Sequence, residues 1–95
     1  MLDRNCLAIN IWDGFNWSNN SSPNNNTAVI VNADYNTSSP SPQGSFNACS
    51  VIVNPGKTLT INSNQYANIQ NDITNNGTII VEDGGSIIQV NDNAV

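Results

Sequence analysis

The side chains of this chain that could take part in catalysis are its carboxylates, because the sequence contains no histidine. Without histidine, neither a Ser-His-Asp nor a Cys-His arrangement can form. Cleavage of polysaccharides on stacked β-strands needs paired carboxylates, or a basic residue beside carboxylates. The candidates are Asp34, Asp72, Glu82, Asp83 and Asp92. Glu82 and Asp83 are neighbours in a turn sequence, where solvated carboxylates are the simpler interpretation, so we predict no catalytic residue and no enzyme.

Calcium is the ion that best suits these side chains, since hard cations prefer carboxylate, amide and backbone carbonyl oxygens. The candidate ligands are Asp13, Asp34, Glu82 and Asp83. The sequence contains neither an EF-hand loop nor the Gly-Gly-x-Gly-x-Asp nonapeptide repeat. Two isolated cysteines without histidine do not indicate zinc. We therefore expect no cofactor, with a weak calcium site as a minor alternative.

Three aromatic residues, Trp12, Phe15 and Trp17, surround the tight-turn signal Asp13-Gly14. Flat rings can stack on sugar faces, which would make this cluster a glycan-binding platform. Aromatic side chains also bury large areas, and the first coil of a repetitive fold must hide its apolar cross-section. We favour the second interpretation, an aromatic cap, and keep glycan binding as the alternative.

The elements that must position these residues are short β-branched runs separated by Asn- and Gly-containing turns. Residues 51–53 (Val-Ile-Val) match residues 79–81 (Ile-Ile-Val) at an offset of 28, and residues 59–61 match residues 88–90 at an offset of 29. Recurring strand-turn units indicate the stacked coils of a β-solenoid. A coil could hold two strands in roughly 20 residues or three in roughly 28, and the pattern does not choose between them.

The expected strands also define an inward face. From the alternation of apolar and polar residues we predict an inward set of Val51, Val53, Leu59, Ile61, Ala67, Ile69, Ile73, Ile79, Val81, Ile88 and Val90. Outward positions are then Thr58, Thr60, Gln70 and Gln89. Near the N-terminus, Leu7, Ile9 and Ile11 alternate with smaller or polar residues, which predicts a half-buried strand. Gly77, after Asn75-Asn76, is expected to adopt a positive φ.

The chain divides into three parts by composition. Residues 1–17 carry the first strand and the aromatic cap or arm, residues 18–47 form a loop-rich first coil, and residues 48–95 form regular coils. The predicted fold class is therefore all-β, a parallel β-solenoid of a few short-strand coils. Twenty of the 95 residues are asparagine, which tolerates left-handed backbone and suits a fold made of many turns.

Cys6 and Cys49 are the only cysteines. If they lie two coils apart, stacking separates them by roughly 9.6 Å, beyond the roughly 7 Å limit for the Cα atoms of a disulfide. Two buried free thiols are the favoured interpretation, and a disulfide remains open if the N-terminal arm folds back.

Charge excludes two classes of partner. The net charge is −5, with Arg4 and Lys57 as the only basic side chains. Nucleic-acid binding by phosphate neutralisation has almost no basis in such a chain, and an anionic membrane surface would repel it. No apolar run reaches the roughly 20 residues of a membrane helix, so we expect no membrane insertion. The start of the chain lacks a signal-peptide pattern, so we expect either a removed signal or a fragment of a longer secreted protein.

The order of several motifs resembles segments of large secreted cell-surface proteins of Bacteroidota such as flavobacteria. A Trp-x-Gly-x-x-Trp-like motif is present as residues 12–17, a Cys-Ser-x-x-Val strand as 49–53, Ile-Thr-Asn-Asn-Gly-Thr-Ile as 73–79 and Gly-Ser-x-x-Gln as 85–89. The resemblance covers nearly the whole chain. It implies export, possible use of the type IX route, an extracellular or cell-surface location, a parallel β-solenoid and no catalytic residues. The sorting domain of a full-length protein of this kind is absent from these 95 residues.

These observations predict a structural building block of an extracellular adhesin or of a self-assembling filament. The terminal coils of a solenoid expose unpaired backbone groups that invite another chain. Head-to-tail contacts that do not close produce open filaments. The apolar residues expected at the two ends are Leu7, Ile9, Ile11, Ile87, Ile88 and Val90.

Overall fold

The protein consists of short β-strands joined by tight turns, as seen in a computed structural model that describes residues 6–38 and 44–89. Within those two ranges no helix is long and apolar enough to cross a bilayer. The strands are β1 (Ala8–Trp12), β2 (Thr27–Val31), β3 (Tyr35–Asn36), β4 (Phe46–Ala48), β5 (Ser50–Val53), β6 (Thr58–Ile61), β7 (Tyr66–Ile69), β8 (Ile73–Asn75), β9 (Thr78–Val81) and β10 (Ser86–Gln89).

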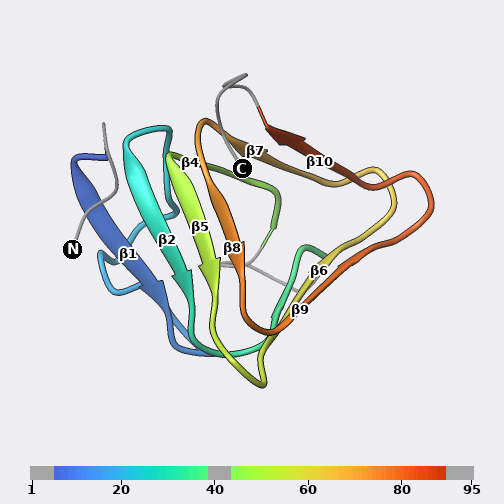
Figure 1. Cartoon of the computed structure of the whole chain (residues 1–95), viewed down its shortest axis with the longest axis horizontal. Helices are drawn as coiled ribbons and strands as arrows, with labels where there is room; N and C mark the ends of the chain where they lie inside the picture. Colours follow the sequence, from blue (N-terminus) through green and yellow to red (C-terminus); the bar gives the residue numbers. More distant parts are fainter. Residues whose placement is uncertain (1–5, 39–43, 90–95) are drawn as a thin grey trace.

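These strands form three parallel sheets that the chain visits in turn (Figure 1). Sheet A has the order β1-β2-β5-β8, sheet B the order β3-β6-β9 and sheet C the order β10-β7-β4. Strands β2, β3 and β4 therefore make one coil, β5, β6 and β7 the next, and β8, β9 and β10 the last. The result is a parallel β-solenoid of about four turns, which confirms the predicted fold class.

Each complete coil holds three strands in 20 to 24 residues rather than in 28. In sheet A, Val29 pairs with Val51 and Val51 with Ile73, at steps of 22 residues, while in sheet B Leu59 pairs with Ile79 at a step of 20. The sequence match between residues 51–53 and 79–81 thus joins segments of two different sheets. The likeness reflects a shared strand-turn pattern, and strands of only two to five residues let three fit into the shorter coil.

The core fills the triangle between the three sheets. All six predicted inward residues of β5, β6 and β7 are buried, which confirms their assignment: Val51, Val53, Leu59, Ile61, Ala67 and Ile69. Ile73 and Ile79 of the last coil are partly buried and pack against this core. Burial falls along the last coil because no described strand stacks on its far side.

The assignment of β10 was wrong by one residue. Ile87 pairs with buried Ala67 and packs against the core, whereas Ile88 pairs with Asn68 and is 47% exposed. Gln89 consequently holds an inward register position opposite Ile69 but is exposed, and its Nε2 donates to the backbone oxygen of Asn71 at 2.8 Å. The outward prediction for Gln89 was therefore wrong in register. Two consecutive isoleucines after a Gly-Gly turn left either one free to face inward, and the strand pairing decides between them.

Val81 differs from the buried residues of the predicted inward set in its exposure. Val81 pairs with buried Ile61, so it holds an inward register position, yet it is 45% exposed because it lies at the open end of the core. The inward assignment of Val81 is therefore confirmed by its strand pairing, although its side chain is not buried. Val90 lies outside the described residues.

The half-buried strand predicted near the N-terminus is present as β1, but the residues that face the core are not the isoleucines. Asn10 pairs with Val29 and Trp12 with Val31, so Asn10 and Trp12 face the core, while Leu7 is exposed and Ile9 and Ile11 are half-buried. Burying the large Trp12 indole outweighs burying an isoleucine at this position. The free-energy cost of burying the Asn10 amide is offset because its Nδ2 and Oδ1 atoms both form hydrogen bonds, as described below.

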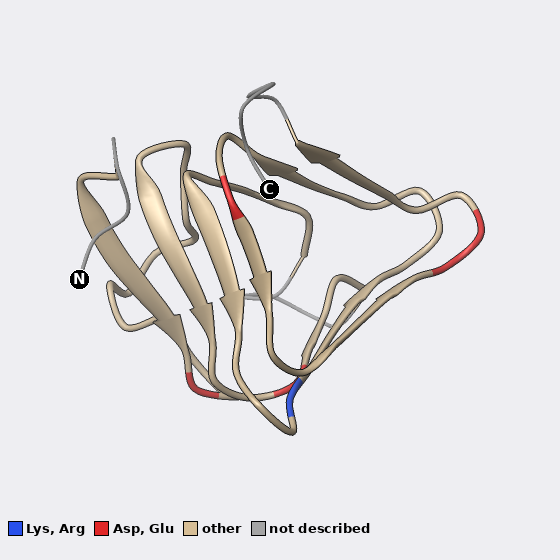
Figure 2. Ribbon diagram, viewed as in Figure 1, with Lys and Arg blue, Asp and Glu red and all other residues tan. Residues whose placement is uncertain are grey.

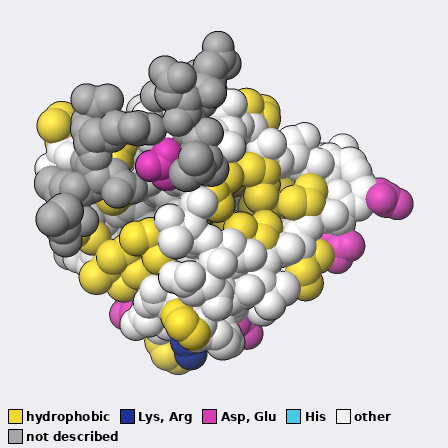
Figure 3. Space-filling model, viewed as in Figure 1, with side chains coloured by type: hydrophobic (Ala, Val, Ile, Leu, Met, Phe, Trp, Pro, Cys, Tyr) yellow, Lys and Arg dark blue, Asp and Glu magenta, His cyan; other side chains and the backbone are white. Residues whose placement is uncertain are grey.

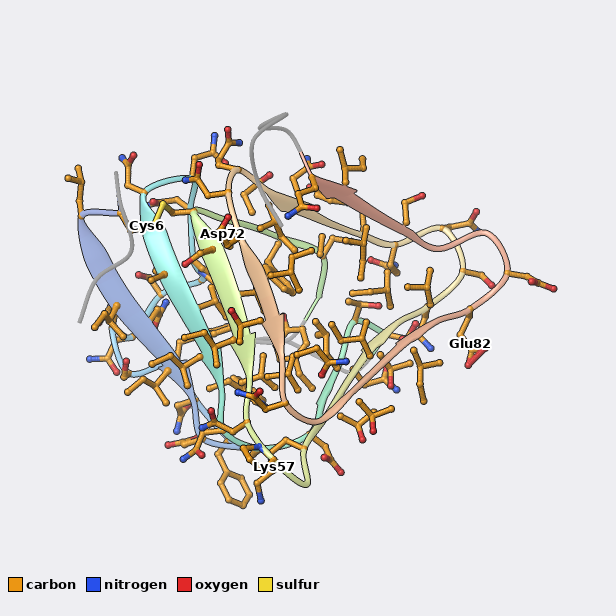
Figure 4. All side chains as sticks on the ribbon, viewed as in Figure 1. Cys6, Lys57, Asp72 and Glu82 are labelled. Atoms are coloured by element: carbon orange, nitrogen blue, oxygen red, sulfur yellow. A yellow bond between two sulfur atoms is a disulfide. The ribbon has the colours of Figure 1, made fainter. Side chains whose placement is uncertain are left out.

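The cysteines form a disulfide, so the expectation of free thiols was wrong (Figure 4). The Cα atoms of Cys6 and Cys49 lie 5.6 Å apart. Leu7 and Ala8 both donate their N–H groups to the backbone oxygen of Asn26, which bends the chain across the start of β2. Cys6 therefore reaches towards the third coil instead of continuing β1, and this is the fold-back alternative that the sequence left open. Around the disulfide pack Ala28 and Ile9.

Gly77 allows close packing of two corners, and the expectation of a positive φ was wrong, since among the glycines only Gly14, Gly44, Gly56 and Gly84 have a positive φ. A Cβ on Gly77 would lie 2.3 Å from the backbone oxygen of Lys57 and 2.5 Å from that of Asn54. The corner of the last coil thus rests directly on the corner between β5 and β6, and only glycine fits there.

Candidate functional site

The carboxylates do not converge on one site. Glu82 and Asp83 lie at the corner between β9 and β10, whereas Asp13 follows β1 and Asp72 precedes β8. Figure 2 shows the acidic segments at separate places on the ribbon. Among the described residues no group of three or more His, Cys, Asp and Glu side chains could hold a metal ion. Asp92 lies outside the described residues.

Two of the candidate calcium ligands instead accept hydrogen bonds from backbone N–H groups, Asp13 within its own turn and Asp34 from the next coil. The Oδ1 atom of Asp13 accepts hydrogen bonds from the N–H groups of Asn16 at 2.7 Å and Phe15 at 2.8 Å. These bonds favour the ionised carboxyl, so they hold the pKa of Asp13 below its ordinary value. Asp34 accepts from the Thr58 N–H at 3.0 Å and so ties the second coil to the third. Both carboxylates therefore act in turns.

An aromatic cluster closes the N-terminal end of the core. The ring centroids of Trp12 and Trp17 are 5.3 Å apart, and each lies within 5.5 Å of the ring of Tyr35. Phe46 joins them at 5.5 Å from Tyr35, edge to face. The Trp12 indole N–H donates to the backbone oxygen of Asp34 at 2.9 Å. Offset and edge-to-face contacts of this kind add stability beyond the area that the rings bury.

The turn after β1 brings Trp17 over the core. Asp13-Gly14 forms the tight turn, with Gly14 at φ 101°, and Trp17 then forms an antiparallel bridge with Trp12. The free edge of β1 is covered at the same point, because Ser18 donates its N–H to the Ile11 oxygen at 2.9 Å and accepts the Ile11 N–H on its hydroxyl at 2.8 Å.

Asn10 fixes the loop that follows. Its Nδ2 donates to the Ser21 oxygen at 2.8 Å, and its Oδ1 accepts from the Asn19 N–H at 3.1 Å. A buried side-chain amide thus satisfies the backbone of the loop of residues 18–21. The N-terminal end of the solenoid is closed by this loop together with the aromatic cluster.

The aromatic cluster offers little to a sugar. Trp12 is 1% exposed and Trp17 is 2% exposed, so neither indole presents a face on which a pyranose ring could stack. Phe15 alone of the three is exposed, at 80%. The geometry of the two tryptophans is that of a cap.

The other end of the solenoid is different in kind. Ile73, Ile79 and Ile87 lie at the end of the core and Val81 is exposed beside them, while Ile80 and Ile88 are exposed on the outward faces of β9 and β10. Figure 3 shows hydrophobic side chains gathered inside the triangle that β8, β9 and β10 outline in Figure 1. We call these six residues the open end.

The backbone of the open end is unpaired on its outer side within the described residues. The N–H groups of Thr78 and Glu82 donate to the oxygens of Lys57 and Ile61 in the coil below. Because a strand alternates with a period of two, the N–H groups of Ile79 and Val81 point away from that coil. Strands β8, β9 and β10 are each the last in their sheet, so three parallel edges end at the same level.

Sequence reasoning named part of these two ends and missed part. Of the residues expected at the N-terminal end, Leu7 is exposed and Ile9 and Ile11 are half-buried on the outer side of β1. Tyr35 and Phe46 were missed because they lie far from Trp12 in sequence, and only the pairing of the sheets brings them together. The signal for Asn10 was its place among apolar residues.

Comparison with known proteins adds no relationship: the chain matches no family model, no curated protein and no solved structure.

Proposed function

We propose that this chain is a non-catalytic structural building block of an extracellular adhesin or of a self-assembling filament. The observation that supports the proposal best is the contrast between the two ends of the solenoid. The N-terminal end is covered by Trp12, Trp17 and the loop of residues 18–21, whereas the open end combines apolar side chains with three parallel strand edges. Such edges are templates for pairing with another chain.

The energetics of the open end favour a joint with a further coil. Each backbone group at β8, β9 and β10 that points away from the coil below can gain a hydrogen bond. Burial of Val81 and of the core-facing Ile73, Ile79 and Ile87 adds a hydrophobic contribution of about 25 cal/mol per Å². In a copy that adds head to tail, the contact is heterologous, so the same joint can repeat along one axis. The proposal thus specifies a direction of growth, from the open end.

The disulfide supports an extracellular location for this building block. Disulfides form and persist in oxidising compartments and stabilise small domains with limited cores. The bond between Cys6 and Cys49 joins the chain before β1 to the start of β5, across one intervening strand of sheet A. It would keep the N-terminal strand of a surface protein paired with its sheet.

The proposal is tested with the intact chain and two lysine variants. Val81→Lys places a charge among the apolar side chains of the open end. Tyr66→Lys is the matched control, because Tyr66 is 40% exposed, close to the 45% of Val81, but lies on the outer face of β7. Size-exclusion chromatography with light scattering across a concentration series, followed by electron microscopy, should show assembly of the intact chain and of Tyr66→Lys. Val81→Lys should remain monomeric.

Two results would contradict the proposal. One is a monodisperse monomer of the intact chain at every concentration. The other is equal assembly of the two variants, which would place the joint away from the open end. Circular dichroism and thermal unfolding of each variant confirm that a loss of assembly is not a loss of fold.

A further inference from the structure

The corner between β8 and β9 contains the only Asn-Gly pair of the chain, Asn76-Gly77. Such a pair can modify itself without an enzyme. The amide nitrogen of the glycine loses its proton and attacks the side-chain carbonyl carbon of the asparagine, a five-membered succinimide forms, and ammonia leaves. Water then opens the ring to aspartate or to isoaspartate. Glycine permits this attack best because it has no side chain to shield its nitrogen.

Exposure at this corner makes the pair accessible, since the Asn76 side chain is exposed. The attacking nitrogen, however, is already occupied: the Gly77 N–H donates to the Oδ1 atom of Asn75 at 3.0 Å. An N–H that is held by an acceptor is less available for deprotonation and attack.

The backbone on both sides of the pair is fixed as well. The Asn76 N–H donates to the Val53 oxygen at 2.9 Å, and the Thr78 N–H donates to the Lys57 oxygen at 2.9 Å. Gly77 has no room to shift towards the coil below, because its backbone lies directly against the oxygens of Lys57 and Asn54. The rotation that would bring the Gly77 nitrogen onto the Asn76 side chain therefore requires the corner to open first.

From this geometry we infer that Asn76 is a site of spontaneous deamidation that the Asn75 side chain and the stacked corner hold in check. The consequence of the reaction is large at this place. In isoaspartate the main chain runs through the side chain and gains one extra carbon. This carbon lies between the two backbone hydrogen bonds that Asn76 makes to Val53 and Thr78 makes to Lys57. Strand β9 can then no longer keep both its register with β6 and its corner contact. The product also carries a new negative charge next to the open end. Only an effect on assembly rests on the proposed function; the chemistry and the loss of stability do not.

The test uses the full chain at mildly alkaline pH and physiological temperature, with deamidation followed over weeks by peptide mass mapping. The folded chain should deamidate at Asn76 at least about ten times more slowly than the same chain in urea, because the reaction must wait for local opening. Asn75→Ala should accelerate the folded-state reaction roughly two- to tenfold, the effect expected for loss of one hydrogen bond. Asn75→Asp keeps an acceptor at this position and should react like the native chain.

Controls separate protection from simple destabilisation. In urea the Asn75→Ala chain and the native chain should react at the same rate, and Asn76→Gln should remove the mass gain from this peptide. Thr74→Ala, a neighbouring exposed strand position, should leave the folded-state rate unchanged. Equal rates in the folded and unfolded native chain would overturn the inference, and so would an Asn75→Ala rate equal to that of the native fold.

Discussion

Replacing Cys6 and Cys49 together by alanine should destabilise the protein by about 4 kcal/mol. The two residues are 43 positions apart in sequence, so the disulfide closes a long loop in the unfolded chain. In the chain-entropy description, the free energy that such a crosslink contributes grows with the logarithm of loop length and reaches this value for a loop of that size. Loss of the two buried sulfur atoms adds a smaller packing cost.

This magnitude is large for the molecule. A domain of this size buries a modest fraction of its surface, and single domains are stable by about 5–15 kcal/mol. With a shift of about 4–8 °C for each kcal/mol, the midpoint of thermal unfolding should fall by roughly 15–30 °C. The disulfide is thus expected to decide whether the fold persists well above ambient temperature.

Urea unfolding of the native chain and of the double variant measures the effect. The uncrosslinked unfolded chain exposes more surface, so the variant should also show a larger dependence of unfolding free energy on urea. The reduced native chain should unfold like the variant. A thermal midpoint within a few degrees of the native value, together with an unchanged dependence of unfolding free energy on urea, would refute the loop-closure reasoning. It would show that the unfolded chain is already compact.

Three further perturbations test the packing. Gly77→Ala should lower the free energy of unfolding by about 2–3 kcal/mol, because the added Cβ overpacks the stacked corners. Gly56→Ala should lower it by about 1 kcal/mol, because its Cβ meets open space but its φ is 78°. Chemical denaturation of both variants measures the difference. Ile87→Asp should cost about 1–3 kcal/mol while Ile88→Asp stays within about 0.5 kcal/mol, and equal melting would reject the pairing of β10. Burial raises the pKa of Tyr35 to about 12, so the folded state retains the phenolic proton that the unfolded state loses near pH 10. The stability that this difference contributes is fully present below about pH 10 and is lost between about pH 10 and 12. Spectroscopic titration of the chain with the only other tyrosine replaced by phenylalanine should show the raised pKa.

Local sequence was enough to predict the fold class and most strands of the last two complete coils. Short β-branched runs and Asn- or Gly-containing turns alternate so regularly after Cys49 that β5, β6 and β7 and their inward residues follow directly. The length of a coil did not follow, because Val51 and Ile79 look alike in sequence although they belong to different sheets. Strand pairing across coils is a long-range property that a repeated local pattern does not encode.

The errors at the two ends have a related cause. In β1 the apolar alternation pointed to Ile9 and Ile11, but a distant cluster of rings and a loop able to satisfy an amide made Trp12 and Asn10 the inward pair. The disulfide was missed because the distance argument assumed that Cys6 continues its strand. Each of these features depends on residues more than ten positions away.

The stacked asparagines have a consequence for how the molecule responds to salt. Parallel coils place equivalent side chains above one another, as Asn47 and Asn68 do, joined at 3.2 Å, and as Asn32 and Asn54 do, joined at 2.9 Å. An amide both donates and accepts, so it can stack on its own kind, whereas like charges at a spacing of about 4.8 Å would repel. Stability of the fold should therefore change little with ionic strength. The net charge of −5 still makes separate copies repel one another electrostatically, and salt screens that repulsion. Added salt should thus promote contact between copies while leaving the unfolding temperature almost where it was.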